Sequence, residues 1–172
     1  MEELGARVAH VLVGGRGQNE AGVIAPAADG RIRLDAARLA GQVVTVIGVD
    51  GRALRLTSSE AANYDDLSAV NIPAVEYPAG ISGQGWDTVE ERPVAPGTAV
   101  LRHDGHELAV QPFAADGSFM FAMTVNLPLN PGRYEVGVQA PGYAPSSRPV
   151  EIAGTTTSWR LGRINLAREL VR

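Results

Sequence analysis

Three of the four Asp-Gly pairs directly separate or precede short β-branched or apolar runs, and this pattern constrains the fold more than any other feature of the sequence. Asp50-Gly51 separates VVTVIGV from ALRL, Asp104-Gly105 separates AVLR from HELAV, and Asp116-Gly117 precedes FMF. An Asp-Gly pair between two such runs is a strong hairpin signal, because both central residues of the tight turn adopt positive φ. Turns at this spacing between short strands predict an all-β sandwich or barrel.

Composition limits the chemistry that the chain can perform. Its 172 residues suffice for one large domain or two small ones. The absence of Cys excludes disulfides and thiolate metal sites. All fifteen basic residues are Arg, so a Schiff-base lysine and a phosphate-loop lysine are excluded as well. The formal net charge of -4 gives no reason to expect nucleic-acid binding over the whole molecule.

The N-terminal sequence lacks the pattern of a leader or a membrane span. MEELGARVA carries two acidic residues, and the apolar run from Val8 to Val13 is too short for either element. We therefore expect synthesis in the cytoplasm without a signal peptide, and no membrane partner.

Four segments are expected along the chain. Residues 1–30 are rich in Gly and Ala toward their end, which is typical of an extended N-terminal arm. Residues 31–79 are expected to form a smaller β-rich domain that ends in a linker, because residues 58–78 show few alternating positions. Residues 80–154 are expected to form a β-sandwich, and residues 155–172 a C-terminal docking tail.

Helix is expected in two short places. Asp35 is suited to cap one turn that Gly41 ends. In the segment from residue 161 to residue 172, Leu161, Ile164 and Val171 recur at helical spacing, which favours an amphipathic tail. A strand followed by a frayed terminus is the alternative.

The region from Gly80 to Gly154 contains a series of short motifs in a characteristic order. These are Ile81-Ser82-Gly83, Pro93-Val94 with Gly97-Thr98-Ala99-Val100, Asp116-Gly117-Ser118-Phe119, and Pro131-Gly132-Arg133-Tyr134 through Pro141-Gly142-Tyr143. In this order and spacing they resemble the carboxypeptidase regulatory-like family. Gly85 departs from the family pattern, which prefers an apolar strand residue there, so Trp86 is expected to supply the missing contact or the strand to bulge.

This resemblance implies a seven-stranded sandwich of the Ig-like or prealbumin-like kind, which usually carries other elements and is not itself catalytic. Pilins of similar fold are stapled by a Lys–Asn cross-link, which a chain without Lys cannot form. Transthyretin-like hydrolases of this fold carry a C-terminal Tyr-Arg-Gly-Ser signal, whereas this chain ends ARELVR. We therefore expect that this chain is not an enzyme and that it has no catalytic residue and no cofactor.

Three motifs suggest ligand sites, and each has a simpler interpretation. His103 and His106 flank a two-residue turn closely enough to share a metal ion, with an ordinary exposed hairpin tip as the alternative. Gly14 to Gly17 follows an apolar run but lacks the dinucleotide-loop spacing. Asp65-Asp66 lacks the spacing of a calcium loop.

Two groups of side chains are candidates for contact with partners. The first lies in the tail, whose four Arg against one Glu also make it locally basic, and comprises Trp159, Leu161, Ile164, Leu166, Leu170 and Val171. The second is a set of aromatic residues suited to stacking on sugars: Trp86, Tyr64 and Tyr77.

These observations favour a non-enzymatic structural protein of a large assembly. We expect an accessory or decoration component of the head or tail of a phage or phage-like virion, in contact with other structural proteins and with copies of itself. The alternative is a carbohydrate- or surface-binding sandwich module.

Overall fold

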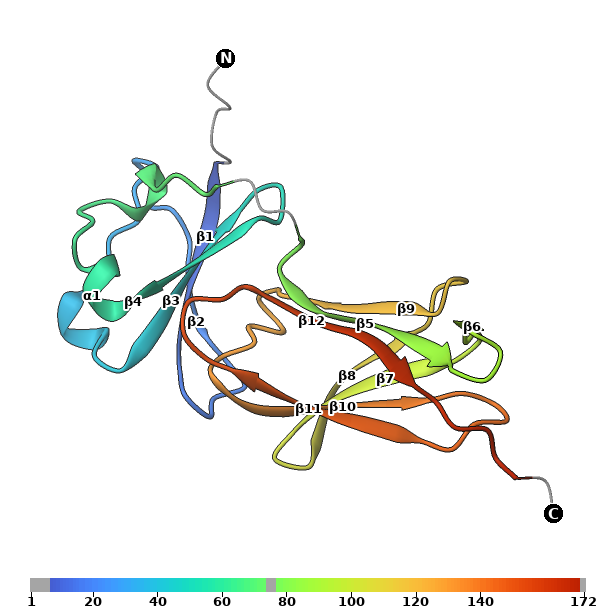
Figure 1. Cartoon of the computed structure of the whole chain (residues 1–172). Coiled ribbons are helices and arrows are strands. Elements are labelled where there is room, and N and C mark those ends of the chain that lie inside the picture. Colours follow the sequence, from blue (N-terminus) through green and yellow to red (C-terminus); the bar gives the residue numbers. More distant parts are fainter. Residues whose placement is uncertain (1–6, 74–76, 171–172) are drawn as a thin grey trace. The chain divides into compact units, whose positions relative to one another are not determined.

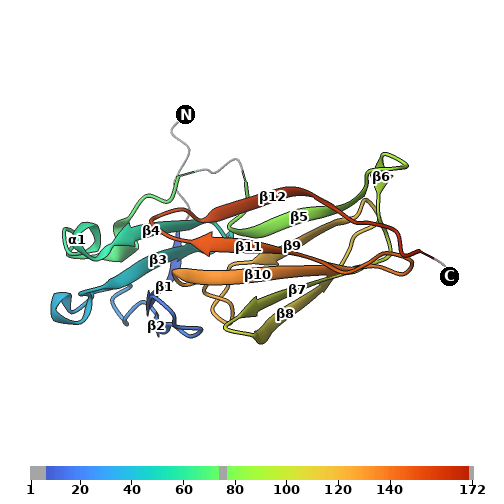
Figure 2. The ribbon, with the colours of Figure 1, turned by 60° about the horizontal axis from the view of Figure 1, so that its bottom comes forward.

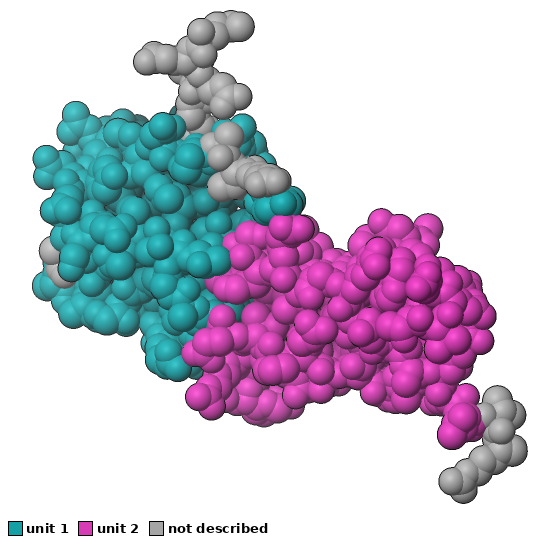
Figure 3. Space-filling model, in the orientation of Figure 1, with its two compact units in different colours: residues 1–79, 123–132, 152–157 teal, residues 80–122, 133–151, 158–172 magenta. Residues whose placement is uncertain are grey.

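The computed structural model describes residues 7–73 and 77–170, and nearly all of its regular structure is β (Figure 1). The chain divides into two compact units, which Figure 3 shows in different colours. Unit 1 comprises residues 1–79, 123–132 and 152–157, and unit 2 comprises residues 80–122, 133–151 and 158–172. Among the described residues, no helix is long and apolar enough to cross a membrane.

Unit 1 is built on an antiparallel sheet with the strand order β2-β1-β3-β4. Its strands are β1 (Val8–Gly15), β2 (Gly22–Ile24), β3 (Gln42–Gly48) and β4 (Ala53–Thr57). The expected N-terminal arm is therefore wrong over residues 8–24, because β1 pairs along its length with β3 and lies inside the sheet. The run from Val8 to Val13 is short for a membrane span but long enough for a strand buried on both faces.

One face of this sheet carries the hydrophobic core of unit 1. Val11, Val44 and Val46 project from the central strands and are fully buried. They pack with residues from the stretch that follows β4, namely Ala61, Leu67, Val70 and Ile72. Residues 58–73 are thus not a linker, since they hold the helix α1 (Ser58–Ala61), the 3-10 turn η2 (Leu67–Ala69) and part of the core.

The short helical turn expected after Asp35 is present. It is the 3-10 turn η1 (Ala36–Arg38), and the Asp35 carboxylate accepts a hydrogen bond from the Ala37 N–H at 3.1 Å. Gly41 follows at φ 71°.

The opposite face of the unit 1 sheet is covered by residues 123–132, which come from much later in the chain. Leu12, Thr45 and Arg55 lie in one row across β1, β3 and β4, and all three are buried. The Arg55 guanidinium donates through Nη2 to the carbonyl oxygens of Pro128 and Leu129 at 2.7 and 2.5 Å. Its Nε donates to the Thr45 hydroxyl at 3.2 Å. Unit 1 is therefore completed by a segment that lies between two strands of unit 2 in the sequence.

Unit 2 is a β-sandwich of the Ig-like or prealbumin-like kind, and the chain as a whole is all-β. One sheet has the order β11-β10-β7-β8, and the other has the order β12-β5-β6 with β9 also paired to β5 (Figure 2). The strands are β5 (Gly80–Asp87), β6 (Arg92–Pro93), β7 (Thr98–His103), β8 (His106–Pro112), β9 (Ser118–Ala122), β10 (Gly132–Gln139), β11 (Ser146–Ile152) and β12 (Ser158–Asn165). Phe121, Leu101 and Val136 are fully buried in this unit.

The Asp-Gly pairs occupy turns, but only one is a two-residue hairpin. Asp104 and Gly105 have φ of 50° and 76° between paired His103 and His106. Asp50-Gly51 lies in a longer loop between β3 and β4. Asp116-Gly117 ends the connection from β8 to β9, strands that belong to different sheets.

The departure at Gly85 has a packing explanation. A Cβ at Gly85 would lie 2.7 Å from the Phe113 ring, and a Cβ at Gly97 would lie 2.4 Å from the same ring. Phe113 also stacks on Phe119, with ring centroids 5.7 Å apart. Phe113, and not Trp86, therefore fills the space beside Gly85.

The C-terminal segment is a strand of the sandwich. Over residues 158–165, β12 pairs in parallel with β5, and its register shifts between Arg160 and Arg163. Gly162 within this irregularity has φ 67°. The expectation of an amphipathic docking helix is wrong over residues 158–165, because the apolar spacing there also fits a strand with a bulge. The alternative was a strand followed by a frayed terminus, and its strand is present.

Candidate functional site

The predicted tail interface divides into a buried part and an exposed part. Ile164 and Leu166 are 1% and 2% exposed, because they enter the sandwich core. Trp159 and Leu161 are half-buried, and Leu170 is 92% exposed. Val171 lies outside the described residues. Two of the six apolar residues assigned to a partner surface therefore pack in the core of unit 2.

The segment that follows β12 is attached to the sandwich through contacts of Arg168 with Asp87. This carboxylate is 1% exposed and accepts hydrogen bonds from the Tyr143 hydroxyl at 2.7 Å and from Arg168 Nε at 2.9 Å. The backbone N–H groups of Val89 and Glu90 donate to its other oxygen at 2.9 and 3.0 Å. Asp87 thus joins the β5–β6 turn, the loop after β10 and the C-terminal segment.

These contacts perturb the ionisation of the whole group. The hydrogen bond from Tyr143, followed by those from the Glu90 N–H and Arg168, holds the pKa of Asp87 well below its ordinary range. The same bond raises the pKa of Tyr143. Hydrogen bonds to Glu90 and Asp87 raise the pKa of Arg168, and the bond from Arg168 in turn lowers the pKa of Glu90. At neutral pH, Asp87, Glu90 and Arg168 are therefore charged while Tyr143 keeps its proton, which suits a structural fastening.

The hairpin tip at His103 and His106 does not assemble a metal site. His103 is buried, its Nδ1 hydrogen-bonds the Arg133 carbonyl oxygen at 2.8 Å, and its ring packs on Tyr134 with centroids 4.7 Å apart. His106 is exposed on the partner strand. Among the residues that the structure describes, no group of three His, Cys, Asp or Glu side chains is arranged to hold a metal ion.

The three aromatic residues suited to sugars are divided between the two units. Tyr64 and Tyr77 belong to unit 1, whereas Trp86 belongs to unit 2. The Arg163 guanidinium carbon lies 3.6 Å from the centroid of the Trp86 ring, so one ring face is occupied.

The two remaining motifs have structural roles. Gly14 and Gly15 end strand β1, and a Cβ at Gly14 would lie 2.4 Å from the Asn130 side chain. Asp66 accepts hydrogen bonds from the backbone N–H groups of Ile32 and Ser68 at 2.9 and 3.0 Å, and so caps η2.

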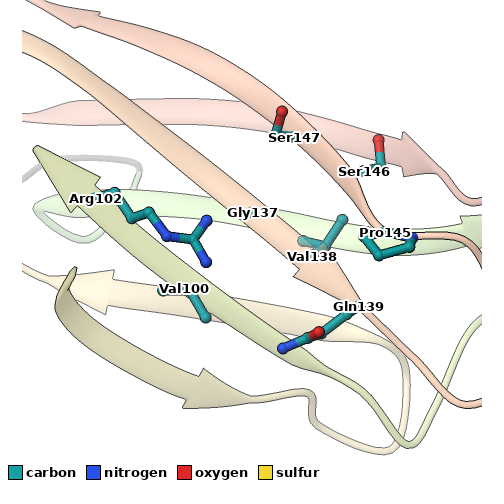
Figure 4. Close-up of a pocket in the computed structure, with 8 residues that line it drawn as sticks. All are labelled: Val100, Arg102, Gly137, Val138, Gln139, Pro145, Ser146 and Ser147. Carbon is teal, nitrogen blue, oxygen red and sulfur yellow. The ribbon is translucent and has the colours of Figure 1, made fainter. Parts of the chain in front are cut away.

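A shallow pocket of about 160 Å³ lies over β7, β10 and β11 (Figure 4). Arg102 runs across Gly137, where a Cβ would lie 2.7 Å from the guanidinium. The same guanidinium pairs with Glu135 at 3.6 Å. The pocket therefore offers one arginine whose charge is already paired, beside the hydroxyl-bearing residues Ser146 and Ser147.

A second hollow, of about 390 Å³, lies on the sheet formed by β12, β5 and β9. We call its polar lining the arginine face: Arg160, Arg163, Ser82, Gln84 and Ser118. Sequence reasoning singled out the basic tail but not its neighbours on β5 and β9. The alternation in the sequence ISGQGW, which puts Ser82, Gln84 and Trp86 at every second position, was the signal that could have identified the β5 residues.

Comparison with known proteins identifies no family for this chain. No model of a known protein family matches the chain, and no curated protein is significantly similar in sequence. A solved structure of the 5-hydroxyisourate hydrolase of Klebsiella pneumoniae aligns with 54% of this chain and 99% of its own, at 18% identity and a TM-score of 0.42. BcpA, the major pilin subunit of Bacillus cereus, aligns with 74% of this chain and 37% of its own, at 9% identity and a TM-score of 0.41.

The prediction that the chain is not an enzyme is corrected by this comparison. It rested on missing catalytic motifs, among them the C-terminal signal of transthyretin-like hydrolases. The prediction is not upheld, because a solved structure with which this chain aligns is a hydrolase. At these identities the likeness is one of fold, and the family resemblance drawn from the motifs stays a prediction.

Proposed function

We propose that this chain is a structural component of a large assembly. The observation that carries the proposal is the way in which the two units share the chain. Unit 1 is built from three separate stretches, and the chain passes from one unit to the other after residues 79, 122, 132, 151 and 157. No single cut at one of these points separates the sequence of unit 1 from that of unit 2. A chain joined in this way is suited to bearing load within an assembly.

Buried polar side chains support the same proposal, because they fix the long connections of each unit. In unit 1, Arg55 holds the Pro128 and Leu129 carbonyls, and the Asn130 amide donates to the Gln18 and Glu20 carbonyls at 3.1 and 2.9 Å. In unit 2, Asp87 holds the β5–β6 turn and the C-terminal segment. Buried hydrogen bonds to loop backbone favour one loop conformation, which a repeating building block requires.

In its finer form, the proposal places the chain on the head or tail of a phage-like virion as an accessory protein. The support for this step is an analogy at the level of the fold, since sandwich modules of this kind recur on virion appendages. Its partners would be copies of itself and other structural proteins, arranged by the symmetry of the particle.

The test is to follow the chain through particle purification. Lysates of cells that make the protein are separated on a density gradient, and the fractions are labelled with gold-conjugated antibody against the chain. We expect the label at regular positions on particles in a fast-sedimenting fraction. The proposal fails if the chain remains at the top of the gradient as a monomer while particles lower in the gradient carry no label.

The alternative, a carbohydrate-binding module, has weaker support. Tyr64 and Tyr77 lie in a different unit from Trp86, and Arg163 covers one face of the Trp86 ring. A glycan array probed with the chain and with Trp86→Ala would favour this alternative only if a defined glycan lost binding in the variant.

A further inference from the structure

The residues of the arginine face are brought together by strand register. Arg160 pairs with Ser82 in the parallel ladder of β12 and β5, and Arg163 pairs with Gln84. In the antiparallel ladder on the other side of β5, Gln84 pairs with Ser118. Because paired residues project to the same side of a sheet, these side chains share one face. Ile81 and Phe119, at the alternate positions, are buried in the sandwich core.

The chemistry of this face differs from that of the chain as a whole. The chain has a net charge of -4, yet the residues that line the hollow and are described by the structure include two arginines and no carboxylate. Ser82, Ser118 and Gln84 add hydroxyl and amide groups beside the guanidinium groups, and the Gln84 amide already donates to the Asp116 carbonyl at 2.7 Å. A concave surface with these groups suits oxyanions, because guanidinium groups bind them through paired N–H donors.

One arginine of this face, Arg163, is partly ordered before any ligand binds. The Trp86 ring supports the Arg163 guanidinium from one side at 3.6 Å, which limits its rotation and leaves its other side toward solvent. A third arginine, Arg148 of β11, donates to the Leu161 and Arg163 carbonyl oxygens at 3.3 and 3.4 Å. Arg148 thereby occupies backbone acceptors of the edge strand β12. A partner would therefore meet the face of this sheet and not pair with its edge.

We propose that the arginine face binds a carboxylate-rich segment of a neighbouring protein. This inference rests on the proposed role in an assembly and names the partner's chemistry. A short acidic segment brings a few carboxylates to two guanidinium groups, while the serine and glutamine side chains suit its peptide groups. A long polyanion such as nucleic acid is less well matched, because the negative charge of the remaining molecule repels it over distances within the Debye length.

The test measures binding of the full-length chain to a fluorescein-labelled acidic peptide by fluorescence anisotropy. The peptide alternates glutamate with serine over about twelve residues, a length of about 40 Å when extended. Two other probes are run beside it: the same peptide with glutamine for each glutamate, and a single-stranded DNA of equal length. The variants are Arg160→Ala with Arg163→Ala, and Arg163→Lys. Arg133→Ala serves as the matched control, because Arg133 is an exposed arginine of the same unit on another strand.

We expect the acidic peptide to bind the wild-type chain and the Arg133→Ala control equally, and the double variant at least about tenfold more weakly. Arg163→Lys should lose part of the affinity, since a lysine keeps the charge without the paired donors. Raising the salt from about 50 to about 300 mM should weaken binding. Thermal unfolding of each variant checks that the fold is retained. We expect it to be retained because the Arg160 and Arg163 side chains are both exposed.

The inference is overturned if the wild-type chain does not bind the acidic peptide, if the double variant binds it as well as the wild type, if the glutamine peptide binds equally, or if the DNA binds more tightly. These results are separate from the particle experiment. If the antibody labels particles but the chain does not bind the acidic peptide, the proposed function stands and only this partner is rejected. If the chain binds the peptide but no particle is labelled, the proposed function is rejected.

Discussion

Individual side chains hold the connections of this molecule by binding backbone or side-chain groups far away in the sequence. Arg55 and the carbonyl of Leu129 are 74 residues apart, and Asp87 and Arg168 are 81 residues apart. Burial of such polar groups is tolerated because each is hydrogen-bonded, and removal of one partner leaves the other unsatisfied. These contacts were not predictable from sequence, since a lone arginine in a strand looks like any exposed arginine.

Gly117 offers a sharp test of packing at a single residue. Gly117 and Gly105 both follow Asp in a turn and have nearly equal φ, 77° and 76°. A Cβ at Gly117 would lie 2.8 and 2.9 Å from the Val94 and Gly85 carbonyl oxygens, whereas a Cβ at Gly105 would meet nothing within 4 Å. We expect Gly105→Ala to lower the free energy of unfolding by about 1 kcal/mol and Gly117→Ala by about 2–4 kcal/mol. Urea denaturation checks this, and equal losses would show that the turn relaxes freely.

The pH dependence of stability should report on Asp87. Its pKa is lower in the folded chain than the ordinary value of 3.8, so the folded state binds fewer protons than the unfolded state between these two values. The stabilisation by Asp87 is therefore present above about pH 4 and is lost as the pH falls through the folded pKa. Asp87→Asn should unfold more easily at neutral pH and show a shallower loss of stability on acidification.

Tyr143→Phe is the companion variant, because it removes the largest cause of the low pKa and leaves the carboxylate in place. The slope of its unfolding free energy against pH should lie between those of the wild type and Asp87→Asn. Urea midpoints measured between about pH 2 and pH 7 give the three slopes, and three identical slopes would show that Asp87 is not the group responsible.

At the scale of elements, β12 is the part of the fold that departs most from sequence-based expectation. Leu161 and Ile164 fit a helical repeat because the bulge near Gly162 changes the alternation of the strand to a spacing of three. The strands that carry the family-like motifs are predicted much better, since Asp-Gly and Pro-Gly pairs determine turns locally. Strand β1 was not predicted because no local turn joins it to its partner β3, which begins 27 residues after β1 ends.

Ile164 distinguishes a core strand from a docking tail. Because it is 1% exposed within unit 2, Ile164→Ala should lower the free energy of unfolding of the isolated chain by about 2–4 kcal/mol. Leu170→Ala is the matched control, because Leu170 is 92% exposed and its loss should change stability by less than about 0.5 kcal/mol. If Ile164→Ala instead left stability unchanged, β12 would be a detachable element.

At the scale of the whole molecule, the sequence predicts an all-β chain with a sandwich after residue 80 but not the sharing of segments between the units. The assignment of residues 123–132 to unit 1 depends on non-local packing, for which turn chemistry and periodicity give no signal. The arginine face could likewise be predicted only in part from the sequence. Its charges lie together on β12, whereas its other polar groups come from β5 and β9, which are distant in the sequence.

A fragment that ends at residue 79 tests this sharing. It contains every strand of the unit 1 sheet but lacks residues 123–132, so Leu12 and Arg55 lose their cover and Arg55 loses two carbonyl acceptors. We expect the fragment to lack a cooperative urea transition and to give poorly dispersed amide NMR signals. A sharp transition with a dispersed spectrum would show that unit 1 is an independent domain.

The central claim is that the chain is built into a larger structure, and electron cryo-microscopy of gradient-purified particles tests it most directly. The account predicts sandwich-shaped density at symmetry-related positions into which both units can be fitted, with the arginine face against a neighbouring subunit. Particles whose every density belongs to other proteins, together with a chain recovered only in free form, would contradict it.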